Sequence, residues 1–389
     1  MLPSPHDPGF VQDPYPVYDA ARAAGPVVYW DAYGMYAAFD HATVRALLRD
    51  KRLGRAVPGR DTTAVPDHLT AFDAVERHSL LELEPPDHTR LRRLVLHAFT
   101  SRRIAALAPD ITDICADLLA ELPAGPFDLI PAYCQQVPVR VIARLLGVPE
   151  DRGPDLLRWS SAMVAMYQAG RTRAIEDAAN TAAAEFSTFL RGYIEERRTD
   201  PRDDLITELI AAEEGGNTLS LDEMVGTCVL LLNAGHEATV HSLGNAVKCL
   251  IENDKTEALT PGQIDATVEE LLRHDPPLHM FTRHVYEKLK VHGITLRPGD
   301  EIALMLGAAG RDPAVYTDPH RFDPARSDPA HLAFGGGLHF CVGAPLARLE
   351  MAIALPALFT ARPNLTLAAP PRYADSYHFH KLDTLMVRP

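Results

Sequence analysis

The chain has 389 residues and a formal net charge of −14 at pH 7. Length alone predicts two or three domains at about 150 residues each. A composition of 47% hydrophobic and 23% charged residues is typical of a globular protein and excludes general disorder. The acidic balance argues against nucleic-acid binding, because phosphate binding needs clustered positive charge.

The cysteine pattern excludes two other classes of protein. The chain contains five cysteines and no C-x-x-C pair: Cys115, Cys134, Cys228, Cys249 and Cys341. This pattern fits neither a zinc ribbon nor the disulfide framework of a small secreted domain. The first ten residues contain no apolar signal segment, and no run of about 18 apolar residues suggests a membrane span. We therefore expect a cytoplasmic protein that is not bound to a membrane.

Short strands and long helices alternate unevenly along the chain. Alternation around Tyr33-Gly34 predicts a hairpin of strands 27–30 and 35–39. Residues 51–85 lack periodicity and predict a long loop of the kind that often has a function. The helical patterns that follow cover residues 87–98, 102–121, 128–146 and 174–198.

The longest predicted helix begins after Ser220. Ser220 and Glu223 form a capping-box signature, and apolar residues then continue past Leu250. About thirty residues at ~1.5 Å each would cross a whole domain, so this helix should be central. It contains three glycines, Gly226, Gly235 and Gly244. They indicate either close helix packing or, at Gly235, space for a group beside the helix.

The C-terminal third predicts strands, an irregular stretch and one helix. Strand-like segments follow Pro276-Pro277 and end at the turn 297–300, and residues 312–329 are rich in proline. A final helix is predicted over 345–359. No linker or repeat marks a domain boundary, so the pattern indicates a mainly α fold with small β-sheets.

The strongest motif covers residues 334–343, with the sequence FGGGLHFCVG. Its glycines permit a tight turn and close backbone approach. Cys341 lies just before a helix N-terminus, where backbone N–H groups and the helix dipole favour a thiolate. A thiolate in this position is either a nucleophile or a metal ligand.

This motif resembles the cysteine loop of the cytochrome P450 family, specifically its bacterial-type haem-thiolate monooxygenases. The resemblance extends from the helix near Asp87 to the C-terminal helix. It implies the cytochrome P450 fold, with residues 1–389 forming one haem domain around a buried haem b (iron protoporphyrin IX) and no fused reductase. Cys341 would be the iron ligand, whose thiolate favours O–O cleavage. Phe334 and Gly343 would lie beside it, and His339 would reach a haem propionate.

Three further motifs agree with this resemblance. Glu270 and Arg273 match E-x-x-R, a spacing that places both side chains on one helix face. The resemblance implies that Arg321 joins them in a structural ion-pair network. It also implies that His88, Arg92 and Arg283 bind the haem propionates, where their charges offset those of the carboxylates. His88 and Arg92 match an H-x-x-x-R pattern, and Arg283 is a later arginine.

The central helix departs from the family pattern. In residues 234–239, Gly235 would make space for dioxygen and Glu237 is the expected acid, but Ala238 occupies the usual threonine position. Thr239 is rotated by about 100° around the helix and cannot simply replace that threonine. A substrate hydroxyl or an ordered water could complete proton delivery. Alternatively, the enzyme could catalyse coupling or desaturation, or it could release peroxide and turn over slowly.

The resemblance also implies a substrate pocket. It would be formed by the loop 55–85, residues near 160–170, the central helix and residues 278–281 and 377–380. Its expected apolar wall consists of Met163, Met166, Tyr167, Leu231, Leu232, Phe281 and Phe379. The substrate would be a small or medium organic molecule.

The electrons should come from separate ferredoxin and reductase proteins. Five arginines and no acid lie between His88 and Arg103: Arg90, Arg92, Arg93, Arg102 and Arg103. This basic stretch would suit an acidic ferredoxin. The leading interpretation is a monooxygenase that inserts one oxygen atom of O2. The alternatives are a peroxide-driven peroxygenase, an oxidative coupling enzyme and, more remotely, a non-catalytic haem sensor.

Overall fold

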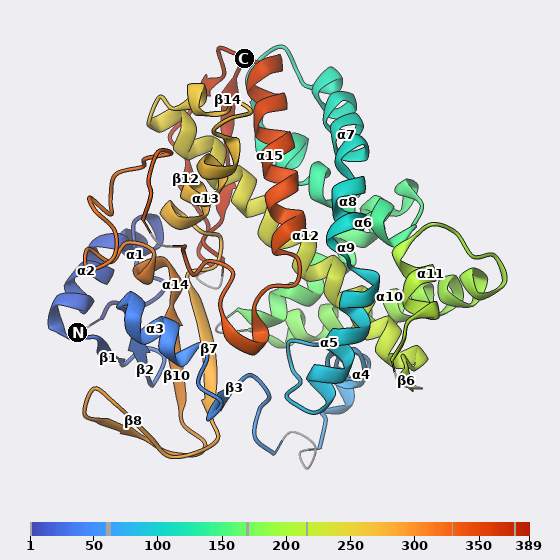
Figure 1. The fold of residues 1–389 in the computed structure, drawn as a ribbon, viewed down its shortest axis with the longest axis horizontal. Coiled ribbons are helices and arrows are strands. Elements are labelled where there is room, and N and C mark those ends of the chain that lie inside the picture. Colours follow the sequence, from blue (N-terminus) through green and yellow to red (C-terminus); the bar gives the residue numbers. More distant parts are fainter. Residues whose placement is uncertain (1, 60–63, 169–170, 215–216, 329, 377–378) are drawn as a thin grey trace.

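The main sheet and most of the helices occupy different parts of the molecule in the computed structural model (Figure 1). The structure describes residues 2–59, 64–168, 171–214, 217–328, 330–376 and 379–389. Helices α4 to α12 lie on the right of the view, whereas β1, β2, β7, β8 and β10 lie at the lower left. The expected mainly α fold with small β-sheets is confirmed.

The largest sheet joins the start of the chain to its C-terminal third. Its strand order is β1-β2-β10-β7-β3, and β1 and β2 form the predicted hairpin. β10 pairs parallel to β2 and antiparallel to β7. The sheet consists of β1 (Val27–Trp30), β2 (Met35–Ala38), β3 (Leu53–Gly54), β7 (Met280–Val285) and β10 (Glu301–Met305).

Four smaller sheets, none wider than three strands, complete the β structure of the described residues. The three-stranded sheet contains β4 (Phe127–Asp128), β11 (Thr366–Leu367) and β14 (Met386–Arg388). The two-stranded sheets pair β5 (Glu213–Glu214) with β6 (Asn217–Thr218), β8 (Leu289–Val291) with β9 (Ile294–Leu296), and β12 (Arg372–Tyr373) with β13 (Leu382–Thr384).

The helices confirm most of the predicted segments. Those before the central helix are α1 (Pro8–Gln12), α2 (Tyr15–Ala24), α3 (His41–Leu47), α4 (Thr70–Glu76), α5 (Asp87–Ala98), α6 (Ser101–Ala106), α7 (Ala108–Glu121), α8 (Gln136–Leu146), α9 (Gly153–Val164), α10 (Arg173–Thr199) and α11 (Leu205–Ala211). After it come α13 (Ile264–His274), α14 (Leu306–Ala309) and α15 (Ala344–Ala361).

Two predicted helices are interrupted. The segment 102–121 breaks at Leu107, and Pro109 then occupies the first turn of α7, where its missing N–H is tolerated. The segment 128–146 begins with strand residues and a π-helical turn over Ile130–Cys134 before α8 starts. Proline therefore sets helix boundaries that apolar periodicity alone conceals.

The central helix, α12 (Leu221–Glu252), has the predicted capping box and packs against α8, α9, α10 and α15. Two of its glycines lie at close contacts with neighbouring segments, and at Gly226 the neighbours include backbone atoms. A Cβ at Gly226 would lie 2.9 Å from the Cβ of His78, and one at Gly244 would lie 2.7 Å from Cδ1 of Ile130. At Gly235 the nearest atom would be 3.6 Å away, on Ile142, which is an ordinary contact.

The helix that follows the cysteine loop, α15, packs against α7 and α12. Among the described residues, it is the one helix long and apolar enough by composition to cross a membrane, and 44% of that window is buried inside the protein. Figure 1 shows it running beside α12 and α7. Its apolar composition therefore serves helix packing.

The packing of α12 generates a stability prediction. Substituting Gly226→Ala places a methyl group 3.1 Å from the carbonyl oxygen of Val75. We expect a loss of about 1–3 kcal/mol in the free energy of unfolding, because the tightly packed backbone cannot move away. Gly192→Ala in α10 meets nothing within 4 Å and should add up to about 1 kcal/mol. Denaturant unfolding of both variants checks this, and equal effects would contradict it.

Candidate active site

The cysteine loop is locked by its own backbone and by the end of α3. The amide of Cys341 donates a hydrogen bond to the carbonyl of Phe334, 3.1 Å away. Gly335 and Gly337 have φ values of 71° and 67°, in the region that favours glycine. A Cβ at Gly337 would also lie 2.5 Å from the carbonyl oxygen of Leu48. Of the glycines predicted from the motif, Gly335 and Gly337 are therefore required by conformation, and Gly337 also by space.

Cys341 differs from the other four cysteines because it is exposed, whereas they are buried. Protein atoms still surround its sulfur, and this burial raises the pKa of the thiol. The amide N–H groups of Gly343 and Ala344, with Arg92 and Arg348, oppose that rise without cancelling it. The helix N-terminus thus favours the thiolate, as predicted, but burial outweighs this effect in the protein alone. A bound metal ion would supply the missing stabilisation.

Phe334 and Gly343 lie next to the cysteine in the expected way. The guanidinium of Arg348 lies 4.5 Å from the ring centroid of Phe334, and Phe334 contacts Phe340 edge-on. A Cβ at Gly343 would lie 3.8 Å from the sulfur of Cys341, so glycine keeps that side of the sulfur uncrowded.

One face of α12 is open in the middle of an otherwise buried helix. Leu230, Ala234 and Ala238 are spaced four residues apart and are all accessible: Ala234 is exposed, and Leu230 and Ala238 are half-buried. The side chains before and after this stripe are buried. The hydroxyl of Thr239 lies on another face and donates to the carbonyl of Gly235 at 3.0 Å. The accessible face therefore presents only methyl and isobutyl groups.

Glu237 is buried between two histidines that the sequence reading missed. Its carboxylate oxygens lie 3.6 Å from Nδ1 of His236 and 3.5 Å from Nε2 of His241. Burial alone would raise the pKa of Glu237, but His241, His236 and Lys381 outweigh it and lower that pKa to about 2. Burial also lowers the pKa of His236 to about 4 and lowers that of His241. At neutral pH, an ionised carboxylate thus lies between two neutral imidazoles.

A group of basic side chains surrounds Glu84 at another edge of the site. Nε2 of His339 lies 3.0 Å from Oε1 of Glu84, and the backbone N–H of Arg55 donates to the same oxygen at 2.6 Å. The ring of His88 lies 4.5 Å from that of His339. The guanidiniums of Arg55 and Arg283 lie 5.8 and 5.7 Å from the ring of Phe281. Sequence reasoning missed Arg55 and Glu84, which lie in the aperiodic segment 51–85.

This basic group fits a ligand that carries carboxylates. Neither ring nitrogen of the fully buried His88 has a hydrogen-bond partner among the described residues. Burial, with the charges of His339 and Arg92, lowers the pKa of His88 to about 4. Arg283 is only 2% exposed, and this burial, together with the charge of Arg55, lowers its pKa to about 10. Propionates would give His88 a partner and would add a charged partner to Arg283, which donates to the carbonyl of Thr282 at 2.9 Å, so the residues present fit a haem.

Arg92 does not join this group through a hydrogen bond. Its Nη2 donates to the carbonyl of Phe340 at 2.6 Å and so contacts the cysteine loop. Its position links α5 to the residue before Cys341.

The E-x-x-R pair forms as predicted, but its third member is different. Glu270 and Arg273 are each 3% exposed and share two hydrogen bonds of 2.8 and 2.6 Å. The choice of Arg321 was wrong: its side chain is 67% exposed and pairs with Asp323. Nε of Arg326 instead lies 3.2 Å from both oxygens of Glu270.

The physical reason lies in the irregular segment that follows α13. Arg321 contributes its backbone carbonyl, which accepts from Arg273 and from Arg326 at 3.2 and 3.0 Å. Because this segment has no helical or strand period, spacing alone cannot indicate which arginine turns inward.

The expected pocket residues have different environments. Met163, Met166, Leu231 and Leu232 are buried. Tyr167 donates to Glu76 at 3.0 Å, and Phe281 packs at the basic group around Glu84. Phe379 lies 5.4 Å from the ring of His241 and so reaches the surroundings of Glu237. Tyr377 and His378 lie outside the described residues.

Comparisons with known proteins are consistent across the chain. The sequence model described as Cytochrome P450 matches residues 263–361. The Vitamin D(3) 25-hydroxylase of Pseudonocardia autotrophica is 39% identical, covering 92% of this chain and 89% of that protein. Cytochrome P450 monooxygenase PikC of Streptomyces venezuelae is 37% identical, covering 93% and 87%. A similar solved structure is that of P450BioI in complex with an acyl carrier protein ligated to hexadec-9Z-enoic acid. Its TM-score with this chain is 0.92 at 32% identity, and the match covers 98% of this chain and 99% of that chain.

The ion-pair geometry yields a prediction that distinguishes the two arginines. Arg326→Ala leaves Glu270 with less compensation in a buried position, so we expect a loss of about 3 kcal/mol in the free energy of unfolding. Arg321→Ala removes an exposed side chain and should change it by no more than about 0.5 kcal/mol. Denaturant unfolding of the two haem-loaded variants measures this difference. Equal losses would restore Arg321 to the network.

Proposed function

Since this chain belongs to the cytochrome P450 family and is therefore a haem-binding monooxygenase that incorporates one oxygen atom of O2, we propose that it hydroxylates an apolar organic substrate. We further propose that proton delivery takes place without a threonine hydroxyl on the central helix. The thiolate-ligated haem supplies O2 activation when bound. The roles of the individual side chains below are part of this proposal. The observation that carries it is the accessible face of α12, where Ala238 presents a methyl group.

We assign haem binding to residues at two edges of the site. Cys341 would be the iron ligand, because it is the exposed cysteine, held in a glycine loop with two amides near its sulfur. His88, Arg283 and His339 would bind the propionates, because they are basic and gathered at one edge of the site, and the buried ring of His88 lacks a hydrogen-bond partner among the described residues. Arg92 would hold the loop through Phe340 and add positive charge beside the cysteine.

Proton delivery would begin at Glu237 rather than at a hydroxyl of α12. The hydroxyl of Thr239 is bound to the carbonyl of Gly235 and lies on a buried face. His236 and His241 lie 3.6 and 3.5 Å from the carboxylate of Glu237, so these three groups together would form the start of a proton relay from solvent. The remaining gap beside Ala238 would be bridged by an ordered water or by a hydroxyl of the substrate itself.

The relatives suggest the kind of substrate. One is named for the hydroxylation of vitamin D(3), and the solved neighbour holds a sixteen-carbon fatty acid on a carrier protein. Both ligands are largely apolar. Buried Met163, Met166 and Leu232 would provide a matching apolar wall, with Phe379 beside His241. We therefore expect a medium-sized apolar natural product or lipid as substrate.

The electron donor would be a separate ferredoxin with its reductase, acting in the cytoplasm. The basic stretch is less positive than its sequence indicates. Arg90 pairs with Glu223, and Arg103 contacts Asp203 and Glu208 at 2.9 Å each. Arg93 and Arg102 are exposed, as are the apolar side chains of Leu96, Leu338 and Phe340. An acidic partner with an apolar centre would fit this mixture of side chains.

The proton-delivery proposal predicts the effect of restoring the missing hydroxyl. With a substrate identified by its haem spin-state shift, Ala238→Thr should change the ratio of product to hydrogen peroxide at least two-fold. The change arises because a new hydroxyl on the accessible face competes with the assisting group. Product and peroxide per NADH are the quantities to measure.

A second variant separates the two positions. Thr239→Val should leave the product-to-peroxide ratio unchanged, because the hydroxyl it removes is bound within the helix. An unchanged ratio in Ala238→Thr, or a collapse of coupling in Thr239→Val, would contradict the proposal.

The docking proposal predicts a charge effect at Arg102. Arg102→Glu should slow reduction by an acidic ferredoxin several-fold at low salt and weaken its salt dependence. Arg297→Glu, an equally exposed change in the turn between β9 and β10, serves as the control. Stopped-flow reduction at several ionic strengths gives the rates. Identical rates for both variants would exclude docking at α6.

A further inference from the structure

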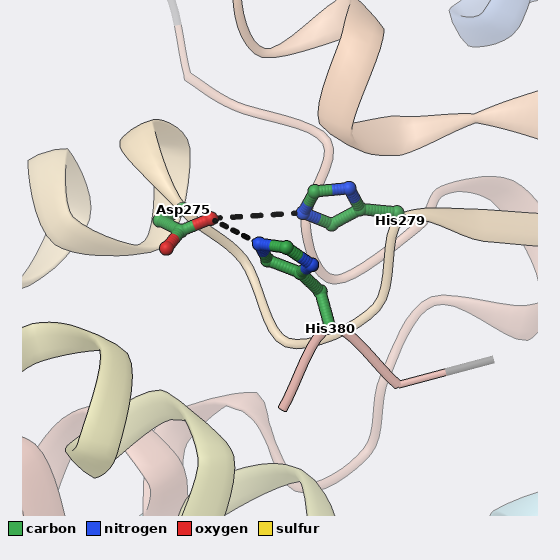
Figure 2. A group of neighbouring side chains, drawn as sticks. All are labelled: Asp275, His279 and His380. Carbon is green, nitrogen blue, oxygen red and sulfur yellow. Dashed lines mark ion pairs between the residues drawn. The ribbon is translucent and has the colours of Figure 1, made fainter. Parts of the chain in front are cut away.

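A buried group of two histidines and one aspartate lies outside the haem-binding and proton-delivery residues assigned above, although both histidines fall in segments expected near the substrate pocket. Asp275 follows the C-terminus of α13, His279 directly precedes β7, and His380 comes from the C-terminal segment before β13. All three are buried. Figure 2 shows both imidazole rings pointing at the same carboxylate oxygen of Asp275. The topology thus brings together three segments that are far apart in the sequence.

The distances suit a metal ion better than direct hydrogen bonds. Oδ1 of Asp275 lies 3.7 Å from Nε2 of His279 and 3.5 Å from Nε2 of His380. The three ligand atoms lie within 4.8 Å of one another. An N–H···O hydrogen bond prefers about 2.9 Å, whereas tetrahedral zinc with bonds of about 2.0–2.1 Å separates its ligand atoms by about 3.3 Å. Small movements would complete a coordination shell.

Surrounding groups fix the orientation of these side chains. The hydroxyl of Tyr18 lies 2.9 Å from Nδ1 of His279, and the hydroxyl of Tyr15 lies 3.4 Å from Nε2 of the same ring. A metal bound by Nε2 would therefore replace only the longer of these two contacts. The hydroxyl of Tyr15 donates to Oδ1 of Asp275 at 2.7 Å, and Tyr373 donates to Oδ2. The ring of Tyr373 also stacks on that of His380, with centroids 3.7 Å apart.

The charges in this region also suit a cation. Burial lowers the pKa of both histidines, so their nitrogens carry free lone pairs at neutral pH. Burial would raise the pKa of Asp275, but His380, His279 and Lys248 hold it well below its usual value. The cations Lys248 and Arg311 act on this group through their charge while their hydrogen bonds go elsewhere: Lys248 pairs with Glu252 at 2.9 Å, and Arg311 donates to the carbonyl of His274 at 2.7 Å.

A cavity of about 310 Å³ adjoins the group and provides an approach. Its lining includes Asp275, His380, Tyr15 and Tyr373. A metal with three protein ligands needs a fourth, and a water molecule in this cavity could supply it. Ligand type, spacing, oriented surroundings and an entry path are therefore all present.

We propose that Asp275, His279 and His380 form a binding site for a divalent cation of the zinc class, separate from the cysteine loop. Two imidazoles and one carboxylate are the ligand set that such cations prefer. The ion would tie the end of α13 and the start of β7 to the C-terminal segment. Its role would be structural.

The test uses the haem-loaded protein and Zn²⁺ alone. Equilibrium dialysis followed by elemental analysis should find one zinc per chain in addition to the haem iron. Zinc should raise the unfolding temperature by about 2 °C or more. His380→Gln should lose both effects. His320→Gln, which removes an exposed histidine 2.9 Å from Asp19, should retain both.

A second measurement does not depend on the folding of any variant. Zinc-edge X-ray absorption and anomalous diffraction of the unmodified protein should place the ion between two imidazole nitrogens and one carboxylate oxygen. Zinc at another position, less than one zinc per ten chains at saturation, or equal binding by His380→Gln would overturn the proposal.

Discussion

The buried charges of Glu270 and Arg273 hold together the segment that leads to the cysteine loop. Residues 312–328 contain hardly any regular structure, so their carbonyl groups need partners from elsewhere. Arg273 donates to the carbonyls of Gly310 and Pro319 at 2.7 and 2.9 Å. Arg326 donates to the carbonyl of Asp318 at 3.2 Å. A buried ion pair is costly unless such additional hydrogen bonds satisfy it.

The site beyond this segment is a balance of charges that the protein alone leaves incomplete. At the basic edge, His88 and Arg283 are buried with lowered pKa values, and neither ring nitrogen of His88 has a hydrogen-bond partner among the described residues. At the loop, burial raises the pKa of the Cys341 thiol. Both conditions are reversed by a ligand that brings carboxylates to one edge and a metal ion to the other. This mutual need explains why a haem fits the residues present.

Proton handling follows the same logic on α12. The carboxylate of Glu237 stays ionised in a buried position because two imidazoles and Lys381 outweigh desolvation. The neighbouring accessible face carries methyl groups at Ala234 and Ala238. A substrate or a water molecule that places a hydroxyl beside Ala238 would fit this face of the helix. The absence of a threonine hydroxyl can thus become a source of substrate specificity.

The short-range features of this protein were readable from its sequence. The glycine pattern around Cys341 requires a particular turn, the capping box at Ser220 starts α12, and the i, i+3 spacing pairs Glu270 with Arg273. Each depends on residues a few positions apart, where backbone geometry alone sets the contact. Local pattern therefore predicted the mainly α fold and the position of the loop.

Only the tertiary structure decided the long-range contacts. It turned Arg326 inward rather than Arg321 and neutralised Arg103 against acids of α11 and the preceding loop. It also brought His380 to Asp275, which the sequence separates by more than a hundred residues. Irregular segments have no period that encodes side-chain direction, and contacts between distant segments depend on how whole helices and sheets pack. These long-range contacts therefore depend on how the whole chain packs.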